Sequence, residues 1–253
     1  MTDPRHLFDL TGRIACVTGA SSGLGRRAAL TLAAAGARVI GIARRIEALQ
    51  SLKDEIGASA EIVVADVTDR DRIEALRDAI AAPFGAPDIL VHAAGVNTRE
   101  AADDVTPEGW DSTLALNLTA PFFLSQALVP AMVGKGWGRI VNFASLQTYR
   151  AFPGGIAYGT SKAGIGQLTR AMSEAWSPHG ITANAIGPGF FPTELTEAVF
   201  SDPARAKRNA AQTCLRRNGC LDDIDGPMVF LCSEASSYVT GQILMVDGGF
   251  TAK

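Results

Sequence analysis

The stretch that decides the fold is "RIACVTGASSGLGRRAALTLAAAG", residues 13–36, in which a glycine-rich turn connects an apolar run to a helical pattern. Residues 13–18 form a continuous run of β-branched and apolar side chains, which is typical of a strand buried on both faces of a parallel sheet. Residues 25–36 have the periodicity of a helix and end on Gly36, which suits a left-handed helix cap. The sequence therefore predicts a strand, a turn and a helix in immediate succession, as in a doubly wound α/β domain.

The same alternation of apolar runs and helical patterns continues along the rest of the chain. Further strands are predicted at 37–43, 61–66, 88–93, 139–144, 181–186 and 242–247, and further helices at 71–82, 112–133 and 157–176. The composition is even along the 253 residues, and no Pro-rich or Ser/Gly-rich linker divides them. We therefore predict one α/β domain over residues 1–253, built on a doubly wound parallel sheet.

The charge and the cysteines exclude several classes of function. The formal net charge is −3 and the basic residues are scattered, which argues against nucleic acid and anionic membranes as partners. The first ten residues are charged and lack a signal-peptide core, and no apolar run approaches the length of a membrane span, so we expect a cytoplasmic protein. The four cysteines form no C-x-x-C pair and have no histidine at ligand spacing, so no metal site is expected.

The glycine turn is a candidate phosphate-binding site. Glycines allow backbone N–H groups to approach a diphosphate, and the following helix places its positive N-terminal end there. We therefore assign the turn to cofactor binding, through Gly19, Ser21, Ser22, Gly23, Leu24 and Gly25. Its spacing is G-x-x-x-G-x-G rather than the commoner G-x-G-x-x-G, and a tight turn without a ligand is the alternative interpretation.

The end of the second strand bears on which dinucleotide is bound. Sites for NAD usually place a carboxylate there, whereas this strand ends at Ala43 and is followed by Arg44 and Arg45. Two guanidiniums suit a ribose 2′-phosphate, so the sequence favours NADP(H) over NAD(H). The alternative is a surface helix that begins with two arginines, although basic residues at a helix start oppose its dipole. Asp66, at the end of the third strand, is expected near the adenine ring.

A second group of polar residues is expected at the same edge of the sheet. Tyr158 and Lys162 are four residues apart, so they project from one face of the predicted helix. Ser145 follows the strand at 139–144, whose carboxyl end opens onto the crevice that holds the dinucleotide. Asn117 is a lone amide in an apolar helical stretch, and it is either a satisfied core residue or part of a polar relay.

These side chains suit the interconversion of a carbonyl and an alcohol. Hydride addition to a carbonyl places negative charge on its oxygen, which Tyr158 can protonate and the Ser145 hydroxyl can polarise. A phenol has a pKa of about 10 in water, and the Lys162 ammonium is expected to lower that pKa. The nicotinamide supplies the hydride. A Tyr-x-x-x-Lys pair alone is common on helices, but the serine, the asparagine and the glycine turn at matching positions favour the catalytic interpretation.

Together these residues make the chain resemble the short-chain dehydrogenase/reductase family over nearly its whole length. The matching motifs are "TGASSGLG" at 18–25, "DV" at 66–67, Asn117, Ser145, "YGTSK" at 158–162, "GPGFFPT" at 187–193 and "VDGG" at 246–249. The resemblance implies a Rossmann-type sheet of seven strands, a nicotinamide cofactor, and a homotetramer or homodimer. It implies catalytic roles for Asn117, Ser145, Tyr158 and Lys162, of which Tyr158 and Lys162 also bind the cofactor. It adds Val67, Ala94, Gly95, Pro188, Gly189 and Thr193 to the expected cofactor contacts.

One position departs from the family pattern. The family usually has Asn-Asn-Ala-Gly after the fourth strand, whereas this chain has "HAAG", residues 92–95. The change affects one structural hydrogen bond, and we interpret His92 as a packed histidine beside the crevice rather than a catalytic group.

Within that family the chain looks most like the gluconate 5-dehydrogenase and sugar-acid branch. The likeness is carried by "HLFDLTGR" at 6–13, "PGFFPTELTEA" at 188–198 and "VDGGFTA" at 246–252. The resemblance implies that Arg99 meets the substrate carboxylate, for which a guanidinium is suited, and the alternative is a solvated loop arginine. Residues 190–218 are predicted to form a mobile lid over the substrate. Substrate contacts are expected from Arg99, Ser145, Tyr149, Phe190 and Phe191, with Leu195 as a further wall.

The predicted function is an NADP(H)-dependent oxidoreductase that interconverts a secondary alcohol and a ketone on a sugar acid or polyol. One alternative is the reduction of a 3-oxoacyl thioester on acyl carrier protein, or of another carbonyl compound. Arg99, Arg150, Arg216 and Arg217 could then form the basic patch that an acidic carrier needs. A remote alternative is a dinucleotide-binding protein without catalysis, which the presence of both Tyr158 and Lys162 disfavours.

Overall fold

The computed structural model describes residues 4–253 and contains a parallel sheet of seven strands. The strands are β1 (Ile14–Thr18), β2 (Arg38–Ala43), β3 (Ala60–Val64), β4 (Ile89–His92), β5 (Gly138–Phe143), β6 (Ile181–Pro188) and β7 (Ile243–Val246). Their order in space is β3-β2-β1-β4-β5-β6-β7, and every neighbouring pair is parallel. All seven predicted strands are present within two residues of their expected bounds, which confirms the doubly wound, Rossmann-type single domain.

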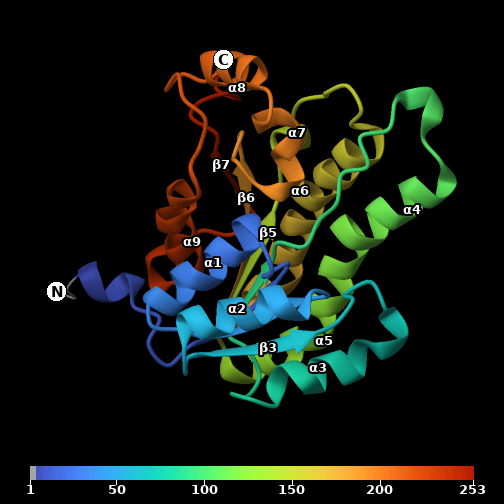
Figure 1. Ribbon diagram of the computed structural model, residues 1–253. Helices are drawn as coiled ribbons and strands as arrows, with labels where there is room; N and C mark the ends of the chain where they lie inside the picture. Colours follow the sequence, from blue (N-terminus) through green and yellow to red (C-terminus); the bar gives the residue numbers. More distant parts are fainter. Residues whose placement is uncertain (1–3) are drawn as a thin grey trace.

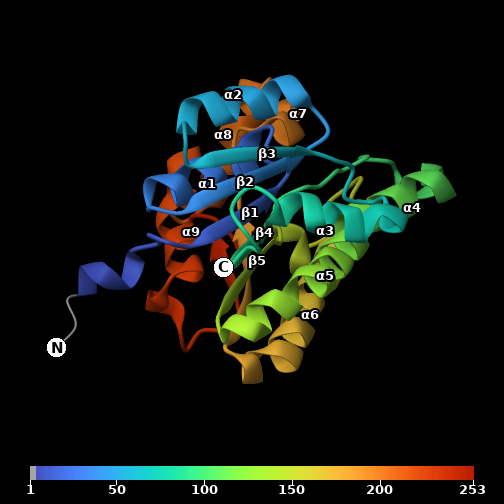
Figure 2. The same ribbon diagram turned by 90° about the horizontal axis from the view of Figure 1, so that it is seen from below.

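Helices cover both faces of this sheet (Figures 1 and 2). One face packs against α1 (Gly23–Ala34), α2 (Ile46–Ile56) and α9 (Asp225–Cys232), and the other against α3 (Ile73–Ala81), α5 (Ala120–Lys135) and α6 (Ile156–Trp176). Alternate residues of β1 serve the two layers: Ala15 and Val17 pack with α1, while Ile14 and Cys16 pack with the opposite layer. Burial on both faces is the reason why the strands read as continuous apolar runs.

The predicted helix at 112–133 is part of a longer helical stretch. It consists of α4 (Pro107–Leu114), a π-helical turn (Ala115–Thr119) and α5. Contrary to the sequence expectation, the stretch Pro107–Lys135 has the length and the mean hydropathy, 1.4, of a helix that could cross a membrane. Its buried side chains Leu124, Leu128 and Met132 belong to the core against the sheet, so its apolar character has a structural cause within the domain.

Several helices were not predicted from the sequence. Helix α2 is amphipathic, with Leu49 and Leu52 buried, an acid in its first turn and Gly57 after its end. Its sequence therefore carries the usual signals of a helix, although none was predicted there. Helix α9 is short and almost entirely apolar, which gives no helical periodicity. Between β6 and α9 lie α7 (Glu197–Phe200) and α8 (Pro203–Gln212), at the carboxyl ends of the strands (Figure 1). No residue of α8 is buried, so helix α8 adds little to the core.

Candidate active site

A cleft of about 1060 Å³ opens at the carboxyl ends of the strands. It includes the point between β1 and β4 where the strand order reverses, which is the usual place for a ligand in an open α/β sheet. Every predicted cofactor residue lines it: Gly19, Ser21, Ser22, Gly23, Leu24, Gly25, Arg44, Arg45, Asp66, Val67, Ala94, Gly95, Tyr158, Lys162, Pro188, Gly189 and Thr193. Six separate segments of the sequence are thus brought to one place.

The glycines of the turn after β1 are required by close packing of the chain. A Cβ atom on Gly19 would lie 2.7 Å from the backbone nitrogen of Ala94, and one on Gly25 would lie 2.4 Å from the carbonyl oxygen of Gly19. Gly23 has a φ of +54°, and a Cβ there would meet the Thr193 side chain at 3.3 Å. The packing explains the glycines without a ligand, so the case for cofactor binding depends on the polar groups around the turn.

Those polar groups form an anion-binding cluster at the start of α1 and α2. The Arg45 guanidinium donates hydrogen bonds to the Ser21 and Ser22 hydroxyl oxygens, at 3.1 and 2.8 Å. It also donates to both carboxylate oxygens of Glu194, at 3.1 and 2.9 Å, and the Ser22 hydroxyl donates to the same carboxylate at 2.9 Å. The bonds from Arg45 and Ser22 lower the pKa of Glu194. The cluster therefore binds one oxyanion already, which is the property that a phosphate site needs.

Arg44 lies at the rim of the same cluster. Its side chain is 76% exposed, and its Nη1 atom is 3.6 Å from a carboxylate oxygen of Asp66. The backbone N–H and hydroxyl of Thr68 donate to Asp66, at 2.9 and 2.7 Å, and these bonds together with Arg44 hold the pKa of Asp66 below its usual value. Two guanidiniums, two serine hydroxyls and a glycine turn at a helix N-terminus fit a nicotinamide dinucleotide that carries a 2′-phosphate.

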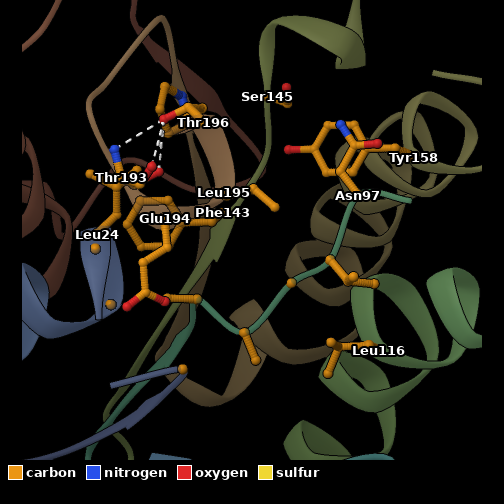
Figure 3. Close-up of a pocket in the computed structure, with 18 of the residues that line it drawn as sticks. Leu24, Asn97, Leu116, Phe143, Ser145, Tyr158, Thr193, Glu194, Leu195 and Thr196 are labelled. Carbon is orange, nitrogen blue, oxygen red and sulfur yellow. Dashed lines mark hydrogen bonds between the residues drawn. The ribbon is translucent and has the colours of Figure 1, made fainter. Parts of the chain in front are cut away.

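Tyr158 and Lys162 lie on one face of α6, as the spacing predicts, and both are buried. Figure 3 shows Ser145 and Tyr158 across the cleft from the segment Thr193–Thr196. The Lys162 ammonium donates to the carbonyl oxygen of Phe143 at 2.7 Å and lies 5.7 Å from the centre of the Tyr158 ring. Ser145 stands two residues after the end of β5 and lines the cleft with Tyr158 and Lys162. The structure thus brings these three predicted catalytic residues to one wall of the cleft.

The pKa values of this pair differ from the expectation. Burial raises the pKa of Tyr158 above 10.0, and the hydrogen bond from Ser145 and the positive charge of Arg99 offset only part of that rise. Burial also lowers the pKa of Lys162 to about 8. The expected lowering of the Tyr158 pKa by Lys162 is not seen in this structure, because burial is the largest influence on that pKa and Lys162 is not among the groups that shift it.

The Ser145 turn is tied to α6 through one threonine. Ser145 begins a short 3-10 helix, and its hydroxyl oxygen accepts a hydrogen bond from the backbone N–H of Gln147 at 3.1 Å. The Thr148 hydroxyl accepts from the N–H of Ser145 at 3.3 Å and donates to the carbonyl oxygen of Lys162 at 3.0 Å. This connection fixes the serine relative to the helix that carries the tyrosine and the lysine.

Asn117 lies in the π-helical turn and is not among the residues that line the cleft. Its amide accepts from the N–H of Val96 at 2.9 Å and donates to the carbonyl oxygen of Val96 at 2.9 Å and to the Ser161 hydroxyl at 3.0 Å. Of the two interpretations left open by the sequence, the structure favours the satisfied amide, which joins the chain after β4 to helix α6. A Cβ on Gly95 would lie 3.3 Å from the Asn117 amide oxygen and 3.8 Å from the Lys162 nitrogen, so both side chains lie beside this glycine.

His92 is packed behind the cleft. Its Nε2 atom lies 2.8 Å from the Ser125 hydroxyl, and burial lowers its pKa to about 3. It is therefore a neutral, hydrogen-bonded ring between β4 and α5, in agreement with the interpretation from the sequence.

The predicted substrate residues divide into three groups. Arg99 and Phe190 line the cleft, and the Arg99 guanidinium donates to the carbonyl oxygen of Leu195 at 2.7 Å. Phe191 reaches the cleft but is buried in the core, where it anchors the chain. Tyr149 is 56% exposed and is not among the residues that line the cleft, so its predicted place in the substrate wall is not seen in the structure.

The cleft residues Phe152 and Glu194 were not predicted from the sequence, and neither was Phe250, which lies outside the cleft lining and packs against Phe152 and Phe190. Phe152 packs edge-on against Phe190, with ring centres 6.4 Å apart, and Phe250 stacks on Phe152 at 6.1 Å. Phe250 also packs edge-on against Phe190 at 5.4 Å, so three segments form one aromatic cluster. Glu194 was missed because a glutamate in a predicted lid gives no sign of the arginine it will meet. Phe152 and Phe250 each lie close to glycines in the sequence. Such a segment gives no sign of the aromatic contacts that its phenylalanine makes in the folded chain.

Within residues 4–253 no group of three His, Cys, Asp or Glu side chains could hold a metal ion. The four cysteines are free thiols, two buried (Cys16 and Cys232) and two exposed (Cys214 and Cys220).

Comparison with known proteins gives matches along almost the whole chain. A family model described as enoyl-(acyl carrier protein) reductase matches residues 19–251. The gluconate 5-dehydrogenase of Gluconobacter oxydans (strain 621H) is 39% identical over 248 residues, which cover 97% of this chain and 97% of that protein. The 3-oxoacyl-acyl-carrier-protein reductase of Escherichia coli (strain K12) is 38% identical over 242 residues, or 96% and 98% of the two chains.

The same result holds for three-dimensional structures. The crystal structure of a gluconate 5-dehydrogenase from Burkholderia cenocepacia J2315, in complex with NADP and tartrate, has a TM-score of 0.94 to this chain. Its sequence is 36% identical, and the match covers 99% of this chain and 100% of that one.

Proposed function

Because the chain belongs to the short-chain dehydrogenase/reductase family of oxidoreductases, we propose that it interconverts a secondary alcohol and a ketone on a sugar acid or polyol, with NADP(H) as the preferred coenzyme. One observation carries this proposal. Tyr158, Ser145 and Lys162 line the same cleft as an oxyanion-binding cluster made by Arg45 and two serines. A proton donor and a phosphate site in one cleft are what a nicotinamide-dependent carbonyl reduction requires.

We assign the proton transfer to Tyr158. In the direction of ketone reduction its hydroxyl gives a proton to the substrate oxygen, and in the direction of alcohol oxidation its phenolate takes the proton back. The Ser145 hydroxyl donates a hydrogen bond to the same oxygen. Burial raises the pKa of Tyr158, and two groups counteract this rise: Ser145 through a hydrogen bond and Arg99 through its positive charge. The nicotinamide, when bound, supplies or accepts the hydride.

We assign Lys162 to the nicotinamide ribose and Asn117 to the support of Lys162. The Lys162 ammonium and the Asn117 amide both lie beside Gly95, and the hydrogen bond from Lys162 to Phe143 holds the ammonium at the end of β5. The glycine turn is proposed to hold the diphosphate, and Thr193 to lie at the nicotinamide. Asp66 is proposed to lie near the adenine, since its hydrogen bonds with Thr68 fix it at the end of β3.

The preference for NADP(H) is proposed from Arg44 and Arg45. Both line the cleft beside the glycine turn, and no carboxylate stands at the last residue of β2, Ala43. The structures of gluconate 5-dehydrogenases from Burkholderia cenocepacia and Beutenbergia cavernae were solved with NADP, which supports the same preference.

An acidic substrate is proposed from Arg99. Its guanidinium extends across the cleft to the chain at Leu195, and it comes close enough to lower the pKa of Tyr158. A substrate carboxylate bound by Arg99 would therefore be placed near the proton donor. The Burkholderia cenocepacia structure contains tartrate, a hydroxy acid, which supports a substrate of this class.

Reduction of a 3-oxoacyl thioester is the second candidate, since a reductase of that kind is 38% identical to this chain. It needs a basic surface for an acidic carrier protein. All four arginines considered for that surface are engaged within the chain, and Arg99 donates to the carbonyl oxygen of Leu195. Arg217 pairs with Asp223, Arg150 donates to the carbonyl oxygen of Lys253, and Arg216 donates to that of Ala211. The Asp223 carboxylate neutralises Arg217, which weakens a basic surface at this place and favours the sugar acid.

We further propose that residues 190–218 act as a lid and that the protein forms a homotetramer or homodimer. The lid is supported by the polar, unburied helix α8, from which Arg205 and Asn209 reach the cleft. The oligomer is supported by exposed apolar residues on the long helix and the last strand, such as Val133 on α5 and Leu244 on β7.

The test is a substrate panel followed by nicotinamide absorbance, with gluconate and other sugar acids, polyols, simple ketones and acetoacetyl thioesters, each with NADP(H) and NAD(H). We expect turnover of sugar acids or polyols with NADP(H). Preferential turnover of the thioester would replace the proposed substrate class.

The matched variant is Tyr158→Phe, which should lower kcat about 10²- to 10⁴-fold. The Kd for NADPH should change by less than about threefold, because the substitution leaves the phosphate contacts in place. Activity close to that of the wild type would remove Tyr158 from the proton transfer.

A further inference from the structure

Glu194 occupies the anion-binding cluster from the opposite wall of the cleft. It lies in the predicted lid, next to Thr193, whose side chain covers Gly23 of the glycine turn. Its carboxylate makes a two-point contact with the Arg45 guanidinium, at 3.1 and 2.9 Å, and accepts the Ser22 hydroxyl at 2.9 Å. Figure 3 shows Glu194 between the lid segment and the turn that carries Leu24. The lid is thus joined to the cofactor wall by an ion pair.

A ribose 2′-phosphate would need the same donors. A carboxylate and a phosphate both take paired N–H bonds from a guanidinium, and both accept hydroxyl donors. One nitrogen of the Arg45 guanidinium, Nη2, already donates to Ser21, Ser22 and Glu194. A 2′-phosphate dianion that entered this cluster would lie next to the Glu194 carboxylate, which already occupies the hydrogen-bond donors that the phosphate needs. The two negative charges would repel each other.

We propose that Glu194 competes with the 2′-phosphate for Arg45 and Ser22, and thereby sets how strongly the site prefers NADP(H) to NAD(H). The inference rests on the proposed coenzyme site. NAD(H) has no 2′-phosphate and leaves the Glu194–Arg45 pair in place, whereas NADP(H) has to displace it. The pair is half-exposed, with side chains 61% and 51% accessible, so its contribution is modest.

The experiment measures binding rather than turnover, on the full chain and with two probes that differ in one phosphate. The Kd values of 2′,5′-ADP and 5′-AMP are determined by calorimetry for the wild type and for Glu194→Gln, which keeps the side chain's size and removes its charge. Binding of 2′,5′-ADP should tighten about three- to tenfold in the variant. Binding of 5′-AMP should change by less than about twofold.

Glu197→Gln is the matched control. Glu197 is exposed one turn further along the lid, carries the same charge and does not line the cleft. Its substitution should leave both Kd values unchanged, which separates a local competition from the general effect of one negative charge. If Glu194→Gln lowered the Kd values of 2′,5′-ADP and 5′-AMP by the same factor, the proposal would be overturned. The carboxylate would then repel both anions equally, whether or not they carry a 2′-phosphate. Unchanged binding of 2′,5′-ADP would also overturn it.

A double-mutant cycle tests the assigned partner. In the Arg45→Ala background Glu194→Gln should no longer affect the Kd of 2′,5′-ADP, and a persistent effect would show that the carboxylate acts elsewhere. The wild type alone tests the coenzyme preference. If it binds both probes equally, the proposed preference for NADP(H) fails even where Glu194→Gln shifts one Kd. If it binds 2′,5′-ADP more tightly and Glu194→Gln changes nothing, the preference stands and only the competition fails.

Discussion

At the scale of single residues, His92 shows how burial sets the pH range of stability. Its pKa is about 3 in the folded chain, against 6.5 for an ordinary histidine. Above pH 6.5 the imidazole is neutral in both states, so it adds no pH dependence. Between pH 6.5 and 3 the unfolded chain binds a proton that the folded chain does not, so stability falls as the pH falls. At pH 5 this residue lowers the free energy of unfolding by about 2 kcal/mol.

His92→Asn should remove this loss of stability at low pH. The free energies of unfolding from urea titrations at pH 7.5 and pH 5 should then differ less than in the wild type.

The control for this prediction is His179→Asn, because His179 is an exposed residue of a short 3-10 helix. This substitution should leave the difference between the free energies of unfolding at pH 7.5 and pH 5 as it is in the wild type. If His92→Asn has the same pH dependence as the wild type, His92 is not the group that titrates.

At the scale of elements, the lid is held at its base by one tight contact. A Cβ on Gly219 would lie 2.7–2.8 Å from the ring of Phe191, and the Gly219 N–H donates to the carbonyl oxygen of Phe190 at 2.9 Å. Both ends of the lid therefore meet there. Gly219→Ala should lower the free energy of unfolding by about 1–3 kcal/mol, because the ring has to move out of a well-packed position. Thermal or urea unfolding measures the loss, and a higher KM for the substrate should accompany it.

Gly134→Ala is the matched control for the lid prediction. Gly134 lies in the last turn of helix α5, and nothing stands within 4 Å of the position its Cβ would take. Alanine favours a helix over glycine by about 1 kcal/mol, so this variant should be as stable as the wild type or more stable. Equal losses in the two variants would show that the Phe191 contact is not the cause.

At the scale of the whole molecule, the long helix presents an apolar side to its surroundings. Pro130 and Val133 are exposed three residues apart on α5, and Val133 is 38% accessible. If copies of the chain meet there, Val133→Glu should place a charge in the contact and shift the protein to a smaller species. Light scattering after size exclusion measures the mass. Val64→Glu is the control, because Val64 is 49% exposed on β3 at the far edge of the sheet. A monomeric wild type would contradict the proposed oligomer.

The sequence predicts the sheet better than the site. Burial on both faces produces seven apolar runs, and each became a strand, since that pattern is local. The positions of Ser145, Tyr158 and Lys162 in one cleft also follow from local spacing and from the common edge of parallel strands. Contacts between distant segments leave no such pattern. The Glu194–Arg45 pair joins residues 149 positions apart, and the pKa of Tyr158 depends on desolvation that only the packed structure determines.

The close fit of Gly19 and Gly25 has a consequence for how such sequences are compared. Their α-hydrogens fill space against neighbouring backbone, so a larger residue is rejected by the scaffold whether or not a coenzyme ever binds. Selection for folding alone would preserve that signature in a descendant that had lost its chemistry. A non-catalytic descendant would keep Gly19 and Gly25 and lose Tyr158. The glycine turn therefore identifies the fold, whereas Tyr158 on helix α6 identifies the activity.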